Sequence, residues 1–310
     1  MSRKRPKGML AMGWASFESA ARGRTEHAPT SADYPDSVVR RVSFEAGGGH
    51  GWRISALETP RARPAPWKIV VITGAPSWAE YWAETLAELP QDREMIVIDR
   101  PGYAASEPME PIADIRTQAQ ALAPVLRAAR GQKVLLVGQS YGAAIAALMA
   151  EADPRGVASL VLLSGFFGET GPTSRWLIDV GSKALRMLPR DLRHAVIEAS
   201  GQKPQLAYAK RALANLTMPI HMIHGDKDDF APIAVAERLA AETLTRQPIR
   251  FVRTEGANHF LNDGPTERLL AALESCIPAR KRWSFRWPRL AALDLRALGF
   301  GAPRQVAGVR

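Results

Sequence analysis

Continuous apolar runs of strand length recur through the middle of the chain, and most are separated by stretches whose apolar residues follow a helical spacing. The runs cover residues 68–72, 95–98, 133–137 and 157–163, further strand candidates with interspersed polar residues lie at 220–224 and 249–252, and the helical stretches include 78–89, 115–126, 143–150 and 233–244. Runs without polar alternation are typical of strands that are buried on both faces. The pattern therefore predicts an α/β fold with a mostly parallel central sheet and helices on both of its faces.

Two segments depart from this alternation. Residues 42–45 and 52–57 are short strand candidates on either side of a glycine triplet at 47–49, which predicts a hairpin at the edge of the sheet. Residues 165–217 contain helical patches at 174–188, 190–199 and 204–214, with no strand between them. This second segment interrupts the order of strands and helices and predicts a helical insertion.

A candidate nucleophile lies where the run 133–137 ends. Gly138-Gln139-Ser140-Tyr141-Gly142 follows the run directly and leads into an alanine-rich stretch, which predicts strand, sharp turn and helix with Ser140 at the apex. Glycines two residues before and two residues after the serine remove side chains that would clash as the chain folds back. The hydroxyl would then lie near the first amides of the helix, where negative charge is stabilised. The alternative is an ordinary tight turn with an inert serine.

Candidates for a general base and its acid partner occur further along the chain. His259 follows the run 249–252 in a glycine-containing loop. The segment 225–232 offers three aspartates, namely Asp226, Asp228 and Asp229. A calcium loop is not favoured because the remaining ligands and the terminal glutamate are absent. A zinc site at His221 and His224 is not favoured either, because a third ligand at suitable spacing is missing.

Together these segments resemble the α/β-hydrolase superfamily, which orders its nucleophile, acid and histidine in this way along the chain. The segment around Ser140 matches the family's Gly-x-Ser-x-Gly elbow, and residues 225–232 match its Gly-x-x-Asp-x-x-x-Pro loop. Residues 99–106 match the family's Asp-x-Pro-Gly-aromatic-x-x-Ser loop, with Ala104 where glycine is commoner. The resemblance covers residues 38–278 and implies the α/β-hydrolase fold.

The resemblance also implies a catalytic triad. Ser140 would be the nucleophile, His259 the general base, and Asp228 the acid that orients the histidine. The choice of Asp228 as the acid depends on the register of one short loop. On sequence alone, Asp226 and Asp229 therefore stay open as alternatives.

In the resembling family, backbone amides hold the oxyanion. The loop after the run 68–72 reads Thr73-Gly74-Ala75-Pro76, and Thr73 stands where the family usually has histidine. The implied donors are the amides of Ala75 and Tyr141. A backbone amide needs no particular side chain, so the change at Thr73 concerns loop packing more than chemistry. Asp99 and Arg100 are interpreted as structural ties beside the site.

The insertion at 165–217 corresponds to the cap of the resembling family, which lies over the nucleophile, and its length implies a small cap. Several large apolar side chains in it are candidates for lining a substrate pocket, namely Phe166, Phe167, Trp176, Leu177 and Met187. The alternative that most of them only join the cap to the core stays open.

The resemblance implies a serine hydrolase that acts on a small-molecule acyl substrate and needs neither a metal nor an organic cofactor. Ester or thioester hydrolysis through an acyl-enzyme on Ser140 is the leading expectation. Acyl transfer, amide hydrolysis and carbon–carbon bond hydrolysis use the same triad and stay open as alternatives. Haloalkane dehalogenases and epoxide hydrolases of the superfamily have aspartate at the apex, so their reactions are not expected. A non-catalytic binding protein on this fold usually lacks a triad member, whereas all three are present here.

The net charge of +10 belongs to the two ends of the chain. Residues 1–30 hold six Lys/Arg and two Glu, residues 280–310 hold eight Lys/Arg and one Asp, and the rest carries a net charge of −1. Basic charge is therefore no sign that the body binds nucleic acid, and no specific nucleic-acid binding is expected. The single cysteine, Cys276, excludes an internal disulfide and fits a reducing compartment.

Residues 1–37 are predicted to form a basic extension and linker, and residues 279–310 a basic aromatic tail. Each end is interpreted either as a loosely docked segment or as a peripheral anchor on an anionic membrane surface, because basic and aromatic side chains occur together in both. No apolar stretch is long enough to span a bilayer, and the N-terminus matches only part of a signal-peptide pattern. We expect a cytoplasmic protein with peripheral membrane contact, with export as the alternative.

Overall fold

The computed structural model describes residues 39–243, 249–259, 261 and 266–277. The predictions for the two ends, residues 1–37 and 279–310, lie outside these residues. Within them, no helix is both long and apolar enough to cross a bilayer.

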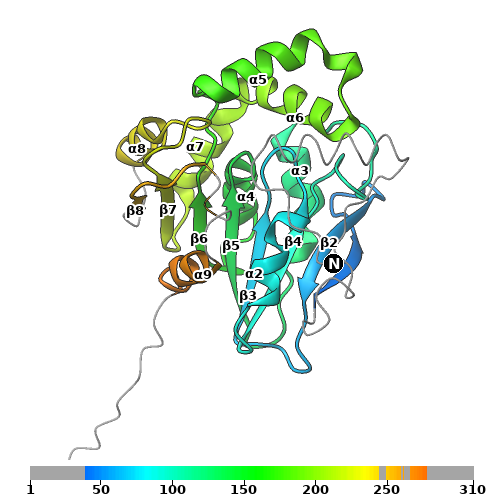
Figure 1. Ribbon diagram of the computed structural model, residues 1–310. Coiled ribbons are helices and arrows are strands. Elements are labelled where there is room, and N and C mark those ends of the chain that lie inside the picture. The colour runs from blue at the N-terminus through cyan, green and yellow to red at the C-terminus, as the bar shows by residue number, and fades with distance from the viewer. Residues whose placement is uncertain (1–38, 244–248, 260, 262–265, 278–310) are drawn as a thin grey trace, which may run out of the picture. The chain divides into compact units, whose positions relative to one another are not determined.

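The described strands form one eight-stranded sheet in the order β1-β2-β4-β3-β5-β6-β7-β8 (Figure 1). Strands β3 to β8 pair in parallel, and the hairpin of β1 and β2 joins them antiparallel at one edge. The strand bounds are β1 Arg40–Glu45, β2 Arg53–Thr59, β3 Trp67–Ile72, β4 Arg93–Ile98, β5 Lys133–Gln139, β6 Val157–Leu163, β7 Ile220–Gly225 and β8 Ile249–Thr254. The predicted mostly parallel sheet and its edge hairpin are confirmed.

Helices cover both faces of the sheet. One face carries α3 (Ile115–Leu122), α4 (Gly142–Ala152), α7 (Leu206–Asn215) and α8 (Ile233–Glu242), and the other carries η1 (Ala79–Trp82), α2 (Ala83–Ala87) and α9 (Thr266–Glu274). The predicted helix at 115–126 ends at Leu122 and continues as the 3-10 turn η2 (Ala123–Leu126), because Pro124 cannot donate a helical hydrogen bond.

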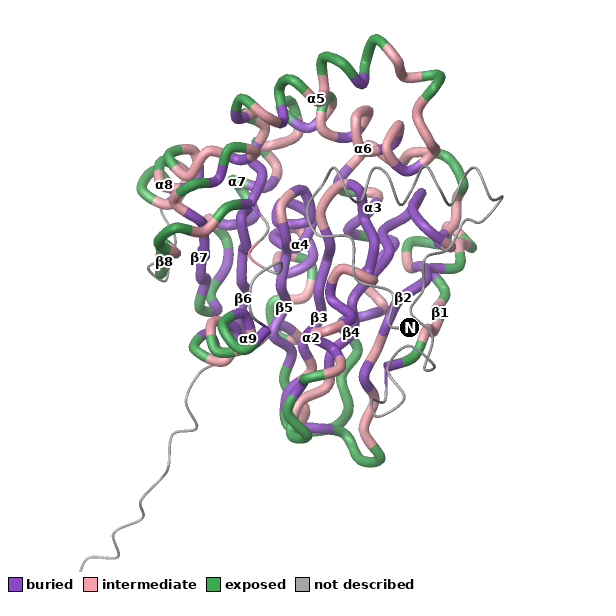
Figure 2. The backbone as a smooth tube through the Cα atoms, in the orientation of Figure 1, coloured by how far each residue is buried: buried purple, intermediate pink, exposed green. Residues whose placement is uncertain are grey.

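Both faces of the central strands are buried, which explains their continuous apolar runs. In β3, Val70 and Ile72 face the core on the α4 side, whereas Ile69 and Val71 face the core on the α9 side. Figure 2 shows the buried residues concentrated along the sheet and α4. The core therefore fixes the strand ends from which the loops of the candidate site start.

The cap consists of α5 (Pro172–Lys183), the turn η3 (Leu185–Met187) and α6 (Arg190–Gly201), and Figure 1 shows the two helices above the strand ends. Helix α6 docks through polar side chains on one face. Asp191 accepts a hydrogen bond from Trp78 Nε1 at 2.6 Å, and His194 Nδ1 lies 2.8 Å from the carbonyl oxygen of Gly102. Buried hydrogen bonds of this kind fix the orientation of a helix more strictly than apolar contact does.

The predicted insertion at 165–217 is longer than the cap that the structure shows. Its third helical patch is α7, which follows the turn η4 (Lys203–Gln205) and packs against α4 on the face of the sheet. Ala209, Ala212 and Leu213 of α7 are buried in the core cluster of that face. The two alanines, one turn apart, let α7 approach α4 closely, so α7 belongs to the helix layer and not to the cap.

A buried charge cluster holds the loop after β4. Asp99 Oδ1 accepts a hydrogen bond from the Ala79 amide at 2.7 Å, and Arg41 is paired with both Asp99 and Glu80. Burial, reinforced by the Asp99 carboxylate, raises the pKa of Glu80 to about 7, and burial also raises the pKa of Asp99. The two carboxyl groups therefore keep a proton at pH values where ordinary carboxyl groups have lost theirs.

This cluster predicts a loss of stability as the pH rises. Between the ordinary glutamate pKa of about 4.3 and a pKa of about 7, folded Glu80 keeps a proton that the unfolded chain has released, so each step upward in pH favours unfolding. Glu80→Gln imitates the protonated side chain. We expect it to be more stable than the wild type by roughly 2 kcal/mol near pH 8, and close to the wild type near pH 5.

Thermal and urea unfolding at the two pH values measure this difference. Glu88→Gln is the matched control, because Glu88 is exposed on the same segment. The control should follow the pH dependence of the wild type. A Glu80→Gln variant that loses stability with pH as steeply as the control would show that the proton is not held at Glu80.

Candidate active site

Ser140 lies at the sharp turn between β5 and α4. Its backbone φ is 50°, a left-handed conformation that is rare for residues other than glycine and marks local strain. Three backbone hydrogen bonds hold the turn, since the Ser140 amide donates to the Leu163 carbonyl at 2.9 Å and the Ser140 carbonyl accepts from Ala143 and Phe166 at 3.0 Å. The serine is therefore fixed between β6 and the first turn of α4.

The two glycines of this turn are required by close packing. A Cβ atom at Gly138 would lie 2.7 Å from the Cα atom of Ala143, and one at Gly142 would lie 2.3 Å from the carbonyl oxygen of Ile72. Both distances are shorter than the contacts that real Cβ atoms make in folded proteins. The structure thus agrees with the steric role predicted for both glycines.

Asp228 lies in the loop after β7 and is almost completely buried. Its Oδ1 atom accepts hydrogen bonds from the amides of Phe230 and Ala231 at 3.0 and 2.8 Å. Its Oδ2 atom faces ring nitrogens of His259 at 2.8 Å and His224 at 3.0 Å. Burial alone would raise the pKa of Asp228, but the hydrogen bonds from the two histidines and the Ala231 amide outweigh it and hold this pKa well below its usual value. Asp228 is therefore a carboxylate.

His259 joins this carboxylate to the serine. Its Nδ1 atom lies 2.8 Å from Asp228 Oδ2, and its Nε2 atom lies 2.9 Å from Ser140 Oγ. Because a carboxylate only accepts hydrogen bonds, Nδ1 carries the proton in the neutral ring and Nε2 is left to accept from the serine hydroxyl. The ring of Phe230 stacks on the imidazole, with centroids 5.3 Å apart. The imidazole is thus held both in its plane and in one tautomer.

The structure separates the three aspartates that the sequence left as rivals. Asp226 Oδ1 accepts from the Gly256 amide at 2.7 Å, which ties the acid loop to the loop that carries His259. The Asp229 carboxylate accepts a hydrogen bond from the hydroxyl of Thr173 at the start of α5, and the Asp229 backbone carbonyl accepts from the Thr173 amide. Of the three, Asp228 is the one placed against His259.

The sequence interpretation missed a second histidine at the acid. His224, considered there only as a zinc ligand and not favoured as one, is 1% exposed, and its Nε2 atom lies 3.0 Å from Asp228 Oδ2 and 2.7 Å from the carbonyl oxygen of Ala231. Because both oxygen atoms that face Nε2 can only accept hydrogen bonds, Nε2 carries a proton. The signal in the sequence was the spacing, because His224 closes β7 four residues before Asp228 and the turn between them folds back on the strand.

The loop after β3 lies directly against the nucleophile. A Cβ atom at Gly74 would be 2.9 Å from Ser140 Cβ. The amides predicted as oxyanion donors belong to Ala75, which follows Gly74, and to Tyr141, which precedes α4. Neither amide donates a hydrogen bond to another residue in the described part of the chain. Their role as donors to an oxyanion beside Ser140 stays a prediction.

Arg100 fixes the direction of one of these amides. The completely buried guanidinium donates from Nη2 to the Gly74 carbonyl at 2.8 Å and from Nε to the Thr73 carbonyl at 2.9 Å. In a planar trans peptide the carbonyl and the following N–H point in opposite directions, so fixing the Gly74 carbonyl also fixes the Ala75 N–H. The Tyr141 ring lies under the guanidinium carbon, 4.8 Å from the ring centroid. Arg100 is a positioning residue for the oxyanion loop.

The counter-charge of Arg100 comes from the cap. Glu198 of α6 accepts from Nη1 and Nη2 of Arg100 at 2.8 and 2.7 Å, and also from Tyr103 at 2.6 Å and Gln118 at 2.8 Å. Both charged side chains are completely buried. The ion pair of Glu198 and Arg100 thereby connects the cap to the loop beside the nucleophile.

Glu198→Gln is expected to lower the free energy of unfolding by about 3 to 5 kcal/mol. The substitution keeps the shape of the side chain but leaves the charge of Arg100 buried without its partner. Urea denaturation measures the change. Glu169→Gln is the matched control, because the Glu169–Arg238 pair is half exposed on both sides and should contribute less than about 1 kcal/mol. Equal losses in the two variants would contradict a special role for the buried pair.

The predicted pocket residues lie in two different environments. Phe166 and Phe167 are buried, 6% and 5% exposed, and the Phe166 amide binds the Ser140 carbonyl. Trp176 is 58% exposed, because it lies on the face of α5 away from the buried Ser174 and Gly181. Trp176 is thus open to solvent and Phe166 and Phe167 are not, and the pocket role of all three stays a prediction.

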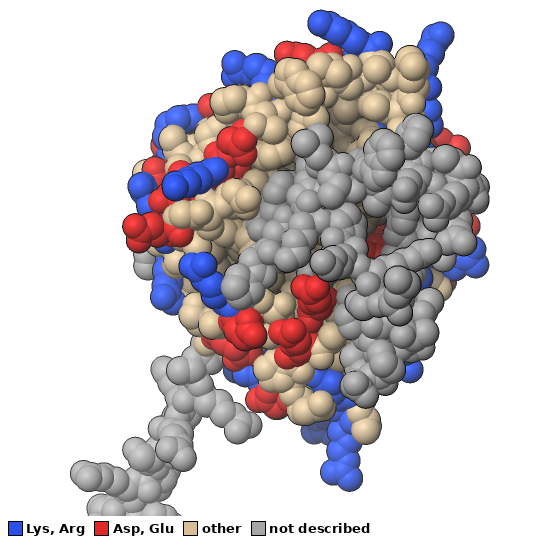
Figure 3. Space-filling view, in the orientation of Figure 1, with Lys and Arg blue, Asp and Glu red and all other residues tan. Residues whose placement is uncertain are grey.

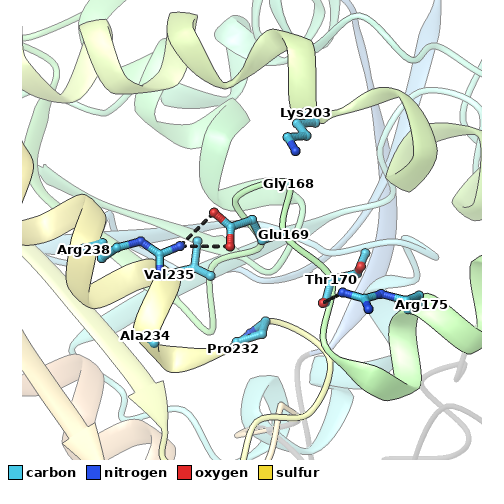
Figure 4. Close-up of a pocket in the computed structure, with 9 residues that line it drawn as sticks. All are labelled: Gly168, Glu169, Thr170, Arg175, Lys203, Pro232, Ala234, Val235 and Arg238. Carbon is cyan, nitrogen blue, oxygen red and sulfur yellow. Dashed lines mark hydrogen bonds and ion pairs between the residues drawn. The ribbon is translucent and has the colours of Figure 1, made fainter.

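A cavity of about 380 Å³ lies where the loop before α5, the turn η4 and the start of α8 meet (Figure 4). Glu169 in its wall is paired with Arg238 of α8 at 2.8 Å, and Arg175 and Lys203 line it from the cap side. None of its lining residues belongs to the hydrogen-bonded group of Ser140, His259 and Asp228. The cavity is therefore separate from the candidate catalytic centre.

Comparison with known families agrees with this arrangement. A sequence model of the alpha/beta hydrolase fold family matches residues 68–209, which run from β3 into α7 and include Ser140. No curated protein matches the chain in sequence.

Several solved structures share the fold at low identity. An esterase from Rhodococcus sp. ECU1013 is 19% identical with a TM-score of 0.58, over 75% of this chain and 97% of its own. A membrane phospholipase A, titled a bacterial virulence factor, is 20% identical with a TM-score of 0.59, over 87% and 99%. An epoxide hydrolase is 17% identical with a TM-score of 0.57, over 77% and 98%. The sheet order and the family-model match together show that this chain has the α/β-hydrolase fold.

Proposed function

We propose that the protein is a serine hydrolase that cleaves a carboxylic ester, or a related acyl bond, through an acyl-enzyme. The observation that carries the proposal is the continuous series of hydrogen bonds from Asp228 through His259 to Ser140, at 2.8 and 2.9 Å. A serine hydroxyl is a weak nucleophile near neutral pH, and a base within hydrogen-bond reach removes that limit.

In the first half of the proposed reaction, Ser140 Oγ attacks the acyl carbon while its proton moves to His259 Nε2. The carbonyl oxygen of the substrate becomes an oxyanion beside the amides of Ala75 and Tyr141. His259 then gives the proton to the leaving alcohol, the bond between the acyl carbon and the alcohol oxygen breaks, and the acyl group remains on Ser140.

In the second half, water replaces the alcohol. His259 takes a proton from the water, the hydroxide attacks the acyl carbon, and the carboxylic acid leaves as Ser140 regains its proton. Asp228 stays ionised throughout and stabilises the imidazolium that forms twice in each cycle. None of these steps requires a metal ion or an organic cofactor.

The identity of the apex residue supports acyl chemistry over epoxide opening, although an epoxide hydrolase is among the structural neighbours. An aspartate at the apex is the feature of epoxide hydrolases in this superfamily, and this chain has Ser140 there. Neighbours titled esterase and phospholipase are consistent with an ester substrate. Acyl transfer would use the same residues with an alcohol in place of water.

Labelling with a fluorophosphonate probe tests the proposal, because the probe forms a stable phosphonyl ester with an activated serine. We expect one adduct per chain, mapped by mass spectrometry to the peptide that contains Ser140. Ser182→Ala, which removes an exposed serine of α5, should label like the wild type. An unlabelled protein, or an adduct at another serine, would refute the proposal. A series of p-nitrophenyl esters then ranks acyl chain lengths, and added alcohols show whether transfer competes with hydrolysis.

A further inference from the structure

Large apolar side chains are exposed on one part of the molecule. Across the described residues, four large hydrophobic side chains are markedly exposed, namely Trp176 at 58%, Val180 at 45%, Met187 at 85% and Met109 at 49%. The first three belong to α5 and η3 of the cap, and the sulfur of Met109 contacts Arg190 of α6 at 3.2 Å. Single exposed apolar side chains are ordinary, but a group gathered on one part of the surface, here the cap, marks an interaction surface.

The helix geometry explains why Trp176 and Val180 are exposed. Ser174 and Gly181 are the buried residues of α5, and a Cβ atom at Gly181 would lie 2.7 Å from Val196 of α6. This face of α5 packs against α6. Trp176 and Val180 are one turn apart on a different face, which the cap leaves uncovered.

The same surface is positively charged. Arg175, Lys183 and Arg186 are exposed between the apolar side chains, with Asp179 as the exposed acid of α5. The stretch 172–193 contains five Lys/Arg and two Asp/Glu, whereas the chain between the basic ends has a net charge of −1. In Figure 3, Lys and Arg project from the top edge, where Figure 1 places α5 and α6, and uncharged surface lies between them.

We propose that this cap face, defined as Trp176, Val180, Lys183, Arg186 and Met187, docks on an anionic lipid surface. A tryptophan with aliphatic side chains and interspersed cations is the combination that partitions into the headgroup region of a bilayer. Contact with a second copy of the chain is disfavoured, because a symmetric contact would bring two faces of net positive charge together. The proposed docking face does not include the basic ends of the chain, residues 1–37 and 279–310.

The position of the cap face also indicates a substrate class. This inference rests on the proposed function. Helix α6 is bound through Glu198 to Arg100, and Arg100 holds the loop beside Ser140, so the cap and the nucleophile lie at the same end of the sheet. A protein docked in this way would present its nucleophile toward the bilayer. The substrate class that follows is an acyl ester held in a lipid surface.

An environment-sensitive fluorophore on the full-length chain tests the docking. Val180→Cys places an NBD label in the cap face, and Arg155→Cys places the same label in the exposed turn before β6, at the opposite end of the strands. The native Cys276 is 1% exposed and should not compete for the label. Phosphatidylcholine vesicles with roughly a third phosphatidylserine should shift the emission of label 180 to the blue, and pure phosphatidylcholine should shift it much less.

Two pairs of substitutions separate the apolar and electrostatic contributions. Trp176→Ser with Met187→Ser should weaken binding to anionic vesicles by roughly 30-fold. Lys183→Gln with Arg186→Gln should weaken it by roughly 20-fold at low salt and much less at high salt. Each variant is compared in a Ser140→Ala background, where docking should be unchanged. Loss of docking and loss of hydrolysis are thereby distinguished.

Three results would overturn the proposal. If both pairs of variants bound vesicles as the wild type does, other parts of the chain would be responsible for the binding. Equal responses of labels 180 and 155 would show that no particular face is docked. A blue shift of label 180 that grows with protein concentration in the absence of vesicles would show that a second copy covers the face.

Discussion

Ser140→Ala is expected to lower kcat for ester hydrolysis by about 10⁴- to 10⁶-fold with little change in KM. The substitution removes the atom that forms the acyl-enzyme, whereas the surfaces that bind the substrate are untouched. The residual rate would come from the oxyanion amides and from binding alone. Alanine fits the turn, since it is smaller than serine and tolerates the φ of 50° to a similar degree. Steady-state kinetics with a p-nitrophenyl ester measure kcat and KM. A thermal melt shows whether the variant stays folded.

The control for this prediction is again Ser182→Ala, which should keep the wild-type kcat. An unchanged melting temperature in Ser140→Ala makes the loss of rate a chemical effect. If the folded variant kept more than about 1% of the wild-type kcat, the nucleophile would have to be another group, because general-base catalysis by His259 alone does not replace a covalent step of this size.

Much of the fold could be predicted from the sequence because local and global preferences agree in it. The apolar runs of β3, β4 and β5 match strands that are buried on both faces, and the glycines around Ser140 are where a chain folding back so closely has no room for a side chain. Short-range patterns of this kind need no knowledge of which elements become neighbours. The triad followed from the order of three loops, and the structure brings Ser140, His259 and Asp228 together.

What the sequence did not reveal depends on tertiary partners. A helical pattern in residues 204–214 predicts a helix, but nothing in the pattern shows that α7 packs on α4 instead of on the cap. The sequence groups Trp176 with Phe166 and Phe167 as large apolar side chains of one segment, yet their exposure differs, because burial on α5 is decided by which face α6 covers. Likewise, Glu198 looks like an ordinary surface residue of a helix until Arg100 is known to face it.

Asp228→Asn is expected to lower kcat by about 10⁴-fold through the tautomer of His259. If the carboxamide oxygen keeps the two backbone hydrogen bonds from Phe230 and Ala231, the NH₂ group faces His259 Nδ1 and His224 Nε2. Two donors would then oppose each other, so the imidazole moves its proton to Nε2 and can no longer accept one from Ser140. The pH dependence of kcat and the fluorophosphonate labelling rate both report the loss.

The neighbouring residues supply controls that the sequence alone could not have chosen. Asp226→Asn keeps the acceptor for the Gly256 amide and should change kcat by less than a few-fold, which separates the true acid from its rival two residues away. His224→Phe keeps a ring but removes one donor from Asp228, and a lost hydrogen bond to a charged group predicts a decrease of roughly tenfold. The expected order of damage is Asp228→Asn, His224→Phe, Asp226→Asn. A drop of similar size in all three would mean that the loop as a whole had shifted, because only a shared displacement affects the carboxylate, its second histidine and the remote loop contact alike.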